Sequence, residues 1–182
     1  MTPRSRAGAL AAGAGLLAAG CVLPGGADAL PQCDPGWFFK HPRRVDKKLV
    51  VFDRERDENL THRGASATFT ANHGGTVSWS MSGGFGGGAE ADLFGLIKTS
   101  VEANLNVQVA RSLHAEVGNA ITVHVPPHRA VVGHYGVFKL VVRGHLYYLT
   151  RTCQRQHNRP RARVKLPHQI GWRVSQHRIH RR

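Results

Sequence analysis

The chain has 182 residues and a formal net charge of +14 at neutral pH. This length suits one domain with a core of its own. The charge argues against basic partners. It favours acidic ones, namely nucleic acid, anionic cell-wall polymers, lipid headgroups or an acidic protein face, without choosing among them.

The beginning of the chain has the composition of a secretory signal peptide, which we assign to residues 1–29. Two arginines precede an apolar run of small residues at 7–23, and Ala27-Asp28-Ala29 forms a cleavage site before Leu30. The apolar run is too short and too rich in glycine and alanine to favour a membrane span. The sequence therefore predicts a secreted, extracellular protein, which argues against nucleic acid as the partner in vivo.

The three cysteines of the chain are informative about secretion. A lipidation site at Cys21 competes with cleavage, but Ala18 stands where such a motif prefers a larger aliphatic residue. Cys33 and Cys153 remain in the mature chain, and an even pair in an oxidising compartment predicts a disulfide. This bond would tie the N-terminal segment to the end of the last core strand. The alternative is two free thiols.

Residues 30–47 carry three prolines and predict an extended, irregular segment in front of the domain. Trp37, Phe38 and Phe39 are adjacent, and three such rings are costly to leave in water, so we expect them to dock on a surface. That surface is either the protein's own sheet or a partner into which the rings insert. Under the second interpretation the partner-binding residues are Asp34, Pro35, Gly36, Trp37, Phe38, Phe39 and Lys40.

Residues 48–153 are predicted to form the β domain. The β-branched run at 48–53 predicts a first strand, which is followed by a charged turn. Residues 66–72 and 75–82 predict a hairpin, because apolar and polar residues alternate along them and His73-Gly74-Gly75 supplies turn residues between them.

The middle of the chain is harder to assign. The glycine run at 83–88 lacks the Gly-Lys-Ser/Thr ending of a phosphate-binding loop and predicts a flexible connection. Residues 89–100 predict one short helix. From 101 to 125 apolar and polar residues alternate with period two, which favours strands over a competing helix with apolar residues at every fourth position. We expect either two strands, broken near 111–119, or one unusually long bent strand.

The rest of the chain predicts the closing strands and a basic extension. Strands are expected at 130–132, 136–142 and 146–153, with glycines that suggest bends or bulges. Residues 154–182 form a basic C-terminal extension that packs in part on the β domain and becomes mobile from 176 onward. Together these elements predict a mainly β fold: a single compact antiparallel β-sandwich-like domain with one short helix and an extended N-terminal segment.

No arrangement of side chains in the sequence points to catalysis or to a metal. His124 with His128, and His177 with His180, lack the further ligands of a zinc site. No nucleophile motif is present, and the acids at 53–58 crowd into a charged turn. We therefore predict a protein that is not an enzyme and that uses neither metal nor cofactor.

Six motifs are spread along most of the mature chain: Asp53–Thr61, Ala67–Ser82, Ala120–Pro126, Tyr135–Val137, Gly144–Cys153 and Gly171–Arg173. In these motifs the chain resembles the adaptor subunit of secreted actinobacterial umbrella toxin particles. The resemblance implies a non-catalytic β protein that links a repeat-bearing toxin stalk to a lectin-like subunit. It also implies that the segment Leu30–Arg44 reaches into a cleft of the lectin-like partner, with Trp37, Phe38 and Phe39 as anchors. The long basic tail departs from that scheme.

Two other functions compete. Aerolysin-like pore-forming β proteins also carry long alternating strands, one of which enters a membrane, and residues 101–125 would be that piece. Against this, 153 mature residues leave little room for the receptor-binding domain that such proteins need. Membrane contact is expected under this alternative alone. A secreted enzyme inhibitor that uses the Trp37 region as a plug is the third possibility.

Overall fold

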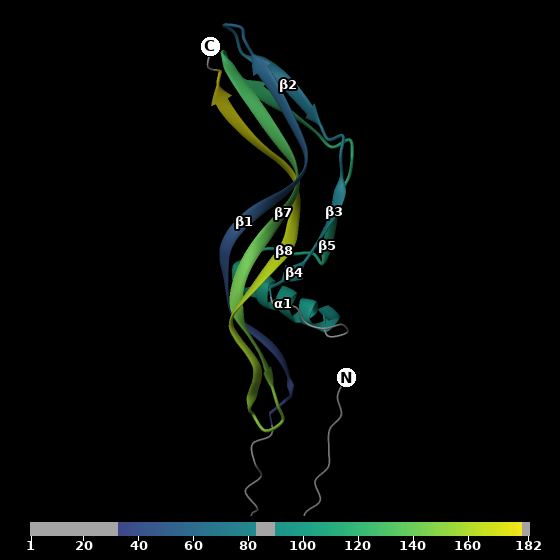
Figure 1. Ribbon diagram of the computed structural model, residues 1–182, viewed down its shortest axis with the longest axis vertical. Helices are drawn as coiled ribbons and strands as arrows, with labels where there is room; N and C mark the ends of the chain where they lie inside the picture. The colour runs from purple at the N-terminus through teal and green to yellow at the C-terminus, as the bar shows by residue number, and fades with distance from the viewer. Residues whose placement is uncertain (1–32, 83–89, 180–182) are drawn as a thin grey trace, which may run out of the picture. The chain divides into compact units, whose positions relative to one another are not determined.

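The computed structural model describes residues 33–82 and 90–179, so the predicted signal peptide, Cys21 and the glycine run lie outside the described residues. Within the compact unit Pro31–Arg182, the described residues form antiparallel sheets and one helix. The predicted fold class, a mainly β and β-sandwich-like domain with one helix, is confirmed (Figure 1).

The main sheet has three long strands and one short strand in the order β1-β7-β8-β4. Its members are β1 (Gly36–Asn59), β7 (Arg129–Leu149), β8 (Arg155–Arg178) and β4 (Ser80–Met81). β7 lies in the middle and pairs antiparallel with β1 on one side and β8 on the other. Its valine-rich sequence suits this position, because a strand between two neighbours is largely buried. We call the end of the sheet near Cys33 and Cys153 the disulfide end.

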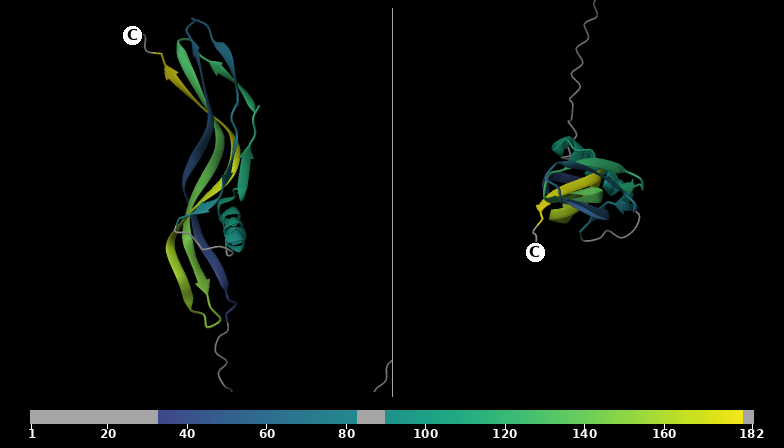
Figure 2. Two further views of the ribbon diagram at one scale, coloured as in Figure 1. Left: turned by 45° about the vertical axis from the view of Figure 1, so that its right-hand side comes forward. Right: turned by 90° about the horizontal axis from the view of Figure 1, so that it is seen from above.

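A long hairpin covers one face of the main sheet (Figure 2). Its two ribbons are β2 (Ala65–Thr70) with β6 (Ala120–Val125), and β3 (Gly75–Ser78) with β5 (Ser112–Ala115). Ala65 pairs with Val125, and Ser78 pairs with Ser112, so both arms advance by 13 residues between these pairs. The two ribbons therefore share one register and form one antiparallel two-stranded unit, which we call the hairpin although β4 and α1 lie between its arms in the sequence.

The hairpin turns its apolar side toward the main sheet and its polar side toward solvent. The buried side chains recur at odd positions along both arms: Ala67, Phe69, Ala71, Val77, Ala115 and Val125. On the polar side, the hydroxyl oxygens of Thr68 and Thr122 lie 3.1 Å apart across the ribbon. The period-two pattern of the sequence thus becomes the two faces of a pleated ribbon.

Helix α1 (Glu90–Leu105) covers the same face of the sheet closer to the disulfide end. Leu93, Ile97 and Val101 are spaced by four and are buried in one core cluster with β7 and β8. The prediction of a strand from residue 101 is wrong for 101–105, because Val101 continues the apolar stripe of the helix. Among the residues described, no helix has the length and apolar character needed to cross a membrane.

The rest of the 101–125 stretch contains two strands, β5 and β6, as one of the two alternatives predicted, with the break at 116–119, where Gly118 has a φ of 87°. The predicted hairpin between 66–72 and 75–82 is wrong, because these segments lie in the same arm and each pairs with the opposite arm. Gly74 instead allows a close approach: a Cβ at this position would overlap the carbonyl oxygen of Ala115.

β1 and β8 are longer than the sequence predicts. The strand predicted at 48–53 extends in both directions, so the segment predicted at 30–47 belongs to the main sheet from Gly36 onward. The basic extension forms β8, and residues 176–178, for which mobility is predicted, pair with β7. β1 and β8 both reach this length because β7 is long and offers backbone hydrogen bonds along each of its two edges.

The glycines of β7 do not interrupt it. A Cβ at Gly133 would lie 2.6 Å from the ring of Phe69, and a Cβ at Gly144 would overlap the ring of Phe39. Aromatic rings therefore occupy the space above these glycines. The three closing strands predicted from the sequence merge into one strand, and the bulges lie in its neighbours, opposite or beside Gly136 and Gly144.

The other face of the main sheet, which we call the open face, is not covered by the hairpin or by α1 (Figure 2). Phe138 and Val141 of β7 lie on this face, yet they are only 9% and 0% exposed. Long cationic side chains cover this surface: the Lys47 ammonium lies 4.5 Å from the ring centre of Phe138, and the Arg173 guanidinium lies 5.6 Å from it. Their alkyl stems bury apolar surface while their charges reach water. Part of the positive charge of the chain thus has a structural role.

His168, on the open face, should make the stability of the protein depend on pH. It lies at a bulge in β8, and its Nε2 atom is buried without a hydrogen-bond partner in the described part of the chain. Burial lowers the pKa of His168, and the charges of Lys47 and Arg44 lower it further. The unfolded chain therefore binds a proton here at higher pH than the folded protein does. The free energy of unfolding should fall as the pH drops below about 6.5, toward the pKa of the folded state.

Replacing His168 with leucine should flatten this dependence. Urea unfolding at about pH 7.5 and about pH 5.5 measures it, because these two values lie on either side of the ordinary histidine pKa of about 6.5, which applies to the unfolded chain. The substitution His177→Gln, at an exposed position of the same strand, is the matched control. If His168→Leu loses as much stability on acidification as the unchanged protein, other groups carry the pH dependence.

Candidate partner-binding site

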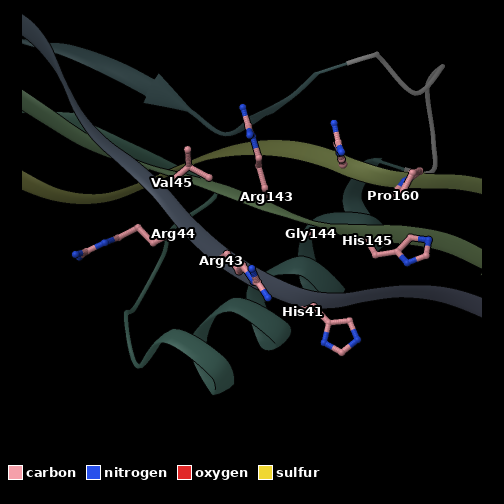
Figure 3. A pocket seen from close by; sticks show the side chains of 9 residues that line it. His41, Arg43, Arg44, Val45, Arg143, Gly144, His145 and Pro160 are labelled. Carbon is pink, nitrogen blue, oxygen red and sulfur yellow. The ribbon is translucent and has the colours of Figure 1, made fainter.

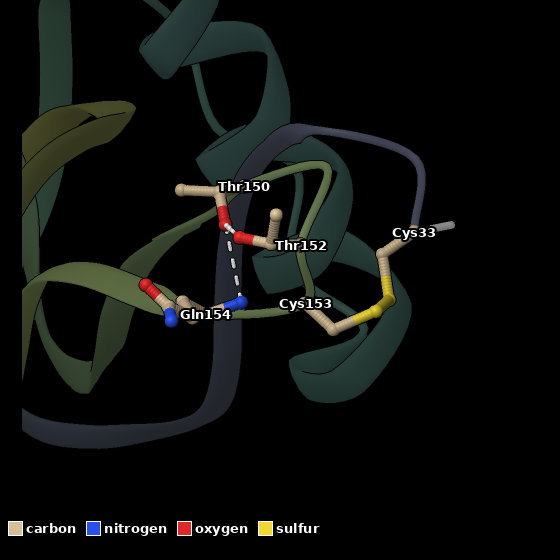
Figure 4. The surroundings of a disulfide bond; sticks show 5 residues. All are labelled: Cys33, Thr150, Thr152, Cys153 and Gln154. Atoms are coloured by element: carbon tan, nitrogen blue, oxygen red, sulfur yellow. Dashed lines mark hydrogen bonds between the residues drawn. A yellow bond between two sulfur atoms is a disulfide. The ribbon is translucent and has the colours of Figure 1, made fainter. Parts of the chain in front are cut away.

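The predicted disulfide between Cys33 and Cys153 is present and closes one end of the main sheet. It joins the residues just before β1 to the turn between β7 and β8, across a sequence separation of 120 residues. The Cys33 N–H also donates a 3.1 Å hydrogen bond to the carbonyl oxygen of Arg151. Figure 4 shows the turn, in which the Gln154 N–H donates to the Thr150 hydroxyl oxygen at 3.1 Å. A covalent bond and local hydrogen bonds thus hold the three strand ends together.

Six aromatic or basic side chains gather on the strands next to this disulfide. We call them the aromatic tip: Trp37, Phe38, Tyr147, Tyr148, Arg155 and His157. They come from β1, β7 and β8, which lie side by side here. Strand register brings them together, because Trp37 pairs with Tyr148 and Phe38 pairs with Tyr147.

The rings of the tip pack on one another on both faces of the sheet. On one face the Trp37 ring centre lies 5.4 Å from that of Tyr148 and 5.6 Å from that of His157. On the open face Phe38 stacks on Tyr147 at 5.5 Å, and Arg155 lies 4.9 Å from the Tyr147 ring centre. These are favourable ring and cation–π geometries, so the side chains are held in place even when no partner protein is bound.

The structure separates the residues that the sequence grouped as one partner-binding segment. Phe39 is 4% exposed and belongs to the core, so it covers the protein's own sheet. Trp37 and Phe38 are half-buried and lie in the aromatic tip. The other predicted residues are exposed or half-buried and lie in β1 or just before it: Asp34, Pro35, Gly36 and Lys40.

Sequence reasoning missed the tip residues that β7 and β8 contribute. Tyr147 and Tyr148 are adjacent in the sequence and so point to opposite faces of a strand, which was a usable signal for aromatic residues on both faces. Arg155 and His157 carried no such signal. Their position depends on which strand lies beside β7, and one sequence alone does not state that register.

An apolar groove of about 440 Å³ runs between β1 and α1, beside the tip. Its lining residues come from these two elements: Phe38, Phe39, Lys40, Leu96, Thr99, Ser100 and Ala103. The Ser100 hydroxyl donates a 2.7 Å hydrogen bond to the carbonyl oxygen of Phe39. β1 is the edge strand of the sheet. An edge strand beside an apolar groove is a surface that suits an extended segment of another protein.

Two acids of β1, Asp53 and Glu55, have a structural role. Asp53 accepts backbone hydrogen bonds from Asn72 at 2.5 Å and His73 at 3.3 Å, and the bond from Asn72 contributes most to holding the pKa of its carboxyl below the usual value. Glu55 accepts a 3.1 Å bond from the backbone of Thr70. These carboxylates tie β1 to the hairpin. Within the described ranges, no three His, Cys, Asp or Glu side chains are grouped so that they could hold a metal ion.

The chain has a distant likeness to solved structures, but no match among known families or curated proteins. The crystal structure of a "Putative pore-forming toxin" from Bacteroides vulgatus superimposes with a TM-score of 0.32 at 12% identity, over 78% of this chain and 54% of that one. The chain thus spans about half the length of that structure. A superposition this loose carries no information about function.

Proposed function

We propose that the chain is a secreted, non-catalytic adaptor that binds a partner protein through the aromatic tip. One observation carries the proposal: half-buried rings of β1 and β7 pack beside an exposed arginine of β8 at one end of the sheet, which a disulfide closes. Following the resemblance of its sequence motifs, we take that partner to be a lectin-like subunit of an extracellular antibacterial toxin complex. A repeat-bearing toxin stalk then binds elsewhere on the chain. No cofactor takes part.

The residue types of the tip support this proposal. Tryptophan, tyrosine and arginine supply a large share of the binding energy at protein interfaces. Because these rings already stack on one another, little side-chain freedom remains to be lost on binding. The disulfide agrees with an oxidising, extracellular location.

Replacing Trp37 with alanine is expected to weaken partner binding by about 30-fold or more, the loss of an interface hot spot. The ring is half-buried against the core, so the free energy of unfolding should also fall by about 1–2 kcal/mol, and the chain should still unfold cooperatively. The measurement is affinity capture of the tagged protein from culture supernatant with quantitative mass spectrometry of what co-purifies.

Trp79→Ala is the matched control, because Trp79 is also half-buried against the same core cluster but packs on Phe94 of α1, away from the tip. It should lose similar stability and keep the partner. If Trp37→Ala loses its cooperative unfolding, Trp37 belongs to the core and is no anchor. If both variants capture the partner equally well, the tip is not the binding site.

A specific feature of the hairpin favours a pore-forming β protein as a second candidate. Its two arms share one register, with an apolar face toward the sheet and Ser and Thr side chains outward. Each arm, 65–78 or 112–125, exceeds the 9–11 residues with which a strand crosses a membrane. A hairpin of this kind has the alternation that membrane insertion requires.

Dye release separates the two candidates. The adaptor proposal expects no release when the purified protein is added to vesicles of phosphatidylcholine and phosphatidylglycerol. Release that rises with protein concentration would overturn it in favour of the pore-forming candidate.

A further inference from the structure

A basic hollow of about 770 Å³ lies where β1, β7 and β8 adjoin, beside the aromatic tip (Figure 3). Six of its lining residues are arginines or histidines, and none is acidic: His41, Arg43, Arg44, Arg143, His145 and Arg161. Figure 3 shows that β1 supplies His41, Arg43 and Arg44, while Arg143 and His145 come from β7. Three strands thus bring cationic groups to one place.

Both neighbours of β7 bulge at this level. In β1 two residues, His41 and Pro42, lie between the partners of His145 and Arg143, where β7 has only Gly144. In β8 Pro160 and Arg161 lie opposite the single residue His145. His41 has a φ of 52°, a conformation that is uncommon for residues other than glycine. Bulges redirect side chains, and here they flank the hollow.

The arginines of the hollow are not paired with acids. Across residues 33–82 and 90–179, the ion pairs of the structure involve other cations, and no carboxylate lies within 4.0 Å of the guanidinium groups of Arg43, Arg44, Arg143 or Arg161. Gathering unpaired like charges is unfavourable, since the charges repel one another. Cations such as Lys47 cover a ring and have a packing role, but within the described part of the chain these four arginines make no cation–π contact. Their arrangement is explained if an anion binds among them.

We propose that this hollow binds the phosphate groups of a linear, base-free phosphate polymer. Arginine favours phosphate because its planar guanidinium donates two parallel hydrogen bonds to oxygens of one group. The polymer is linear because cations continue on both sides of the hollow on the open face, with Arg155 over Tyr147 and Lys47 over Phe138. It carries no bases because no Trp, Tyr or Phe lines the hollow, and the rings beside it, Tyr147 and Phe138, are only 5% and 9% exposed. This inference does not depend on the adaptor proposal, because none of the residues that line the hollow belongs to the aromatic tip.

The test measures binding of inorganic polyphosphate to the full mature chain by calorimetry, as a function of salt. The double substitution Arg143→Gln with Arg161→Gln should weaken binding by about tenfold or more. It should also reduce the slope of log K against log salt by about 1 for each arginine that contacts a phosphate. The control removes the same charge from two exposed arginines outside the hollow, Arg111→Gln with Arg178→Gln, and should change the affinity by less than about threefold.

Each outcome decides the proposal. Loss of affinity in the hollow variant alone, with cooperative unfolding retained, supports it. Equal loss in both variants, or no binding of polyphosphate, overturns the site. Poly-glutamate binding as tightly as polyphosphate overturns the phosphate assignment, and single-stranded DNA binding more tightly than polyphosphate overturns the base-free assignment. Capture of the partner protein by the hollow variant should be unchanged, which separates this result from a failure of the tip.

Discussion

Replacing both Cys33 and Cys153 with serine is expected to lower the free energy of unfolding by about 4 to 5 kcal/mol. The bond closes a loop with a sequence separation of 120 residues, and in the chain-entropy model that constraint on the unfolded chain has about this value. It also holds the start of β1 to the turn between β7 and β8, so its loss should loosen the aromatic tip first. Urea unfolding followed by tryptophan fluorescence measures the change.

Reducing agent supplies the matched comparison. The reduced unchanged protein should unfold at the same urea concentration as the double serine variant, and reductant should have no further effect on that variant. If oxidised and reduced protein unfold together, the loop constraint contributes nothing to stability. The tip would then be held by its strand pairing and ring contacts alone.

Replacing Gly136 with alanine is expected to destabilise the protein by about 3 kcal/mol or more, the upper range for overpacking. A Cβ at this position would overlap the carbonyl oxygen of Val50, so the atom that must move is backbone. Val50 belongs to β1, and moving it would part β1 from β7 near the middle of both strands. Thermal and urea unfolding give the magnitude.

Gly171 of β8 provides the matched control, because it is the pairing partner of Gly136 in the sheet. At Gly171 the nearest atom to an added Cβ is on the Phe138 ring at 3.9 Å, an ordinary contact distance. Gly171→Ala should therefore change the free energy of unfolding by no more than about 1 kcal/mol. Equal effects of the two substitutions would mean that β1 accommodates the added methyl group by shifting.

The aromatic tip shows how far one sequence predicts a site. The adjacent rings Trp37, Phe38 and Phe39 were identified as a group that must dock, and that much follows from their hydrophobicity. Their separation into one core ring and two tip rings follows from the alternation of β1 once its partner strand is known. The arginines of the basic hollow were visible only as part of the overall charge, because they come from three strands.

The sequence by itself determined the alternating strands, the class of the fold and the cysteine pair, because pleat period, composition and cysteine count are local or countable properties. Tertiary structure decided which strands meet. It paired the arm at 65–78 with 112–125 instead of folding it on itself, and it kept Val101 in a helix although its sequence also fits a strand. The tertiary structure also explains the glycines of β7, because an aromatic ring or a backbone carbonyl oxygen occupies the space that a Cβ would fill at these positions. The physical reason is that pairing and close approach depend on residues far apart in the chain, whose register no local pattern encodes.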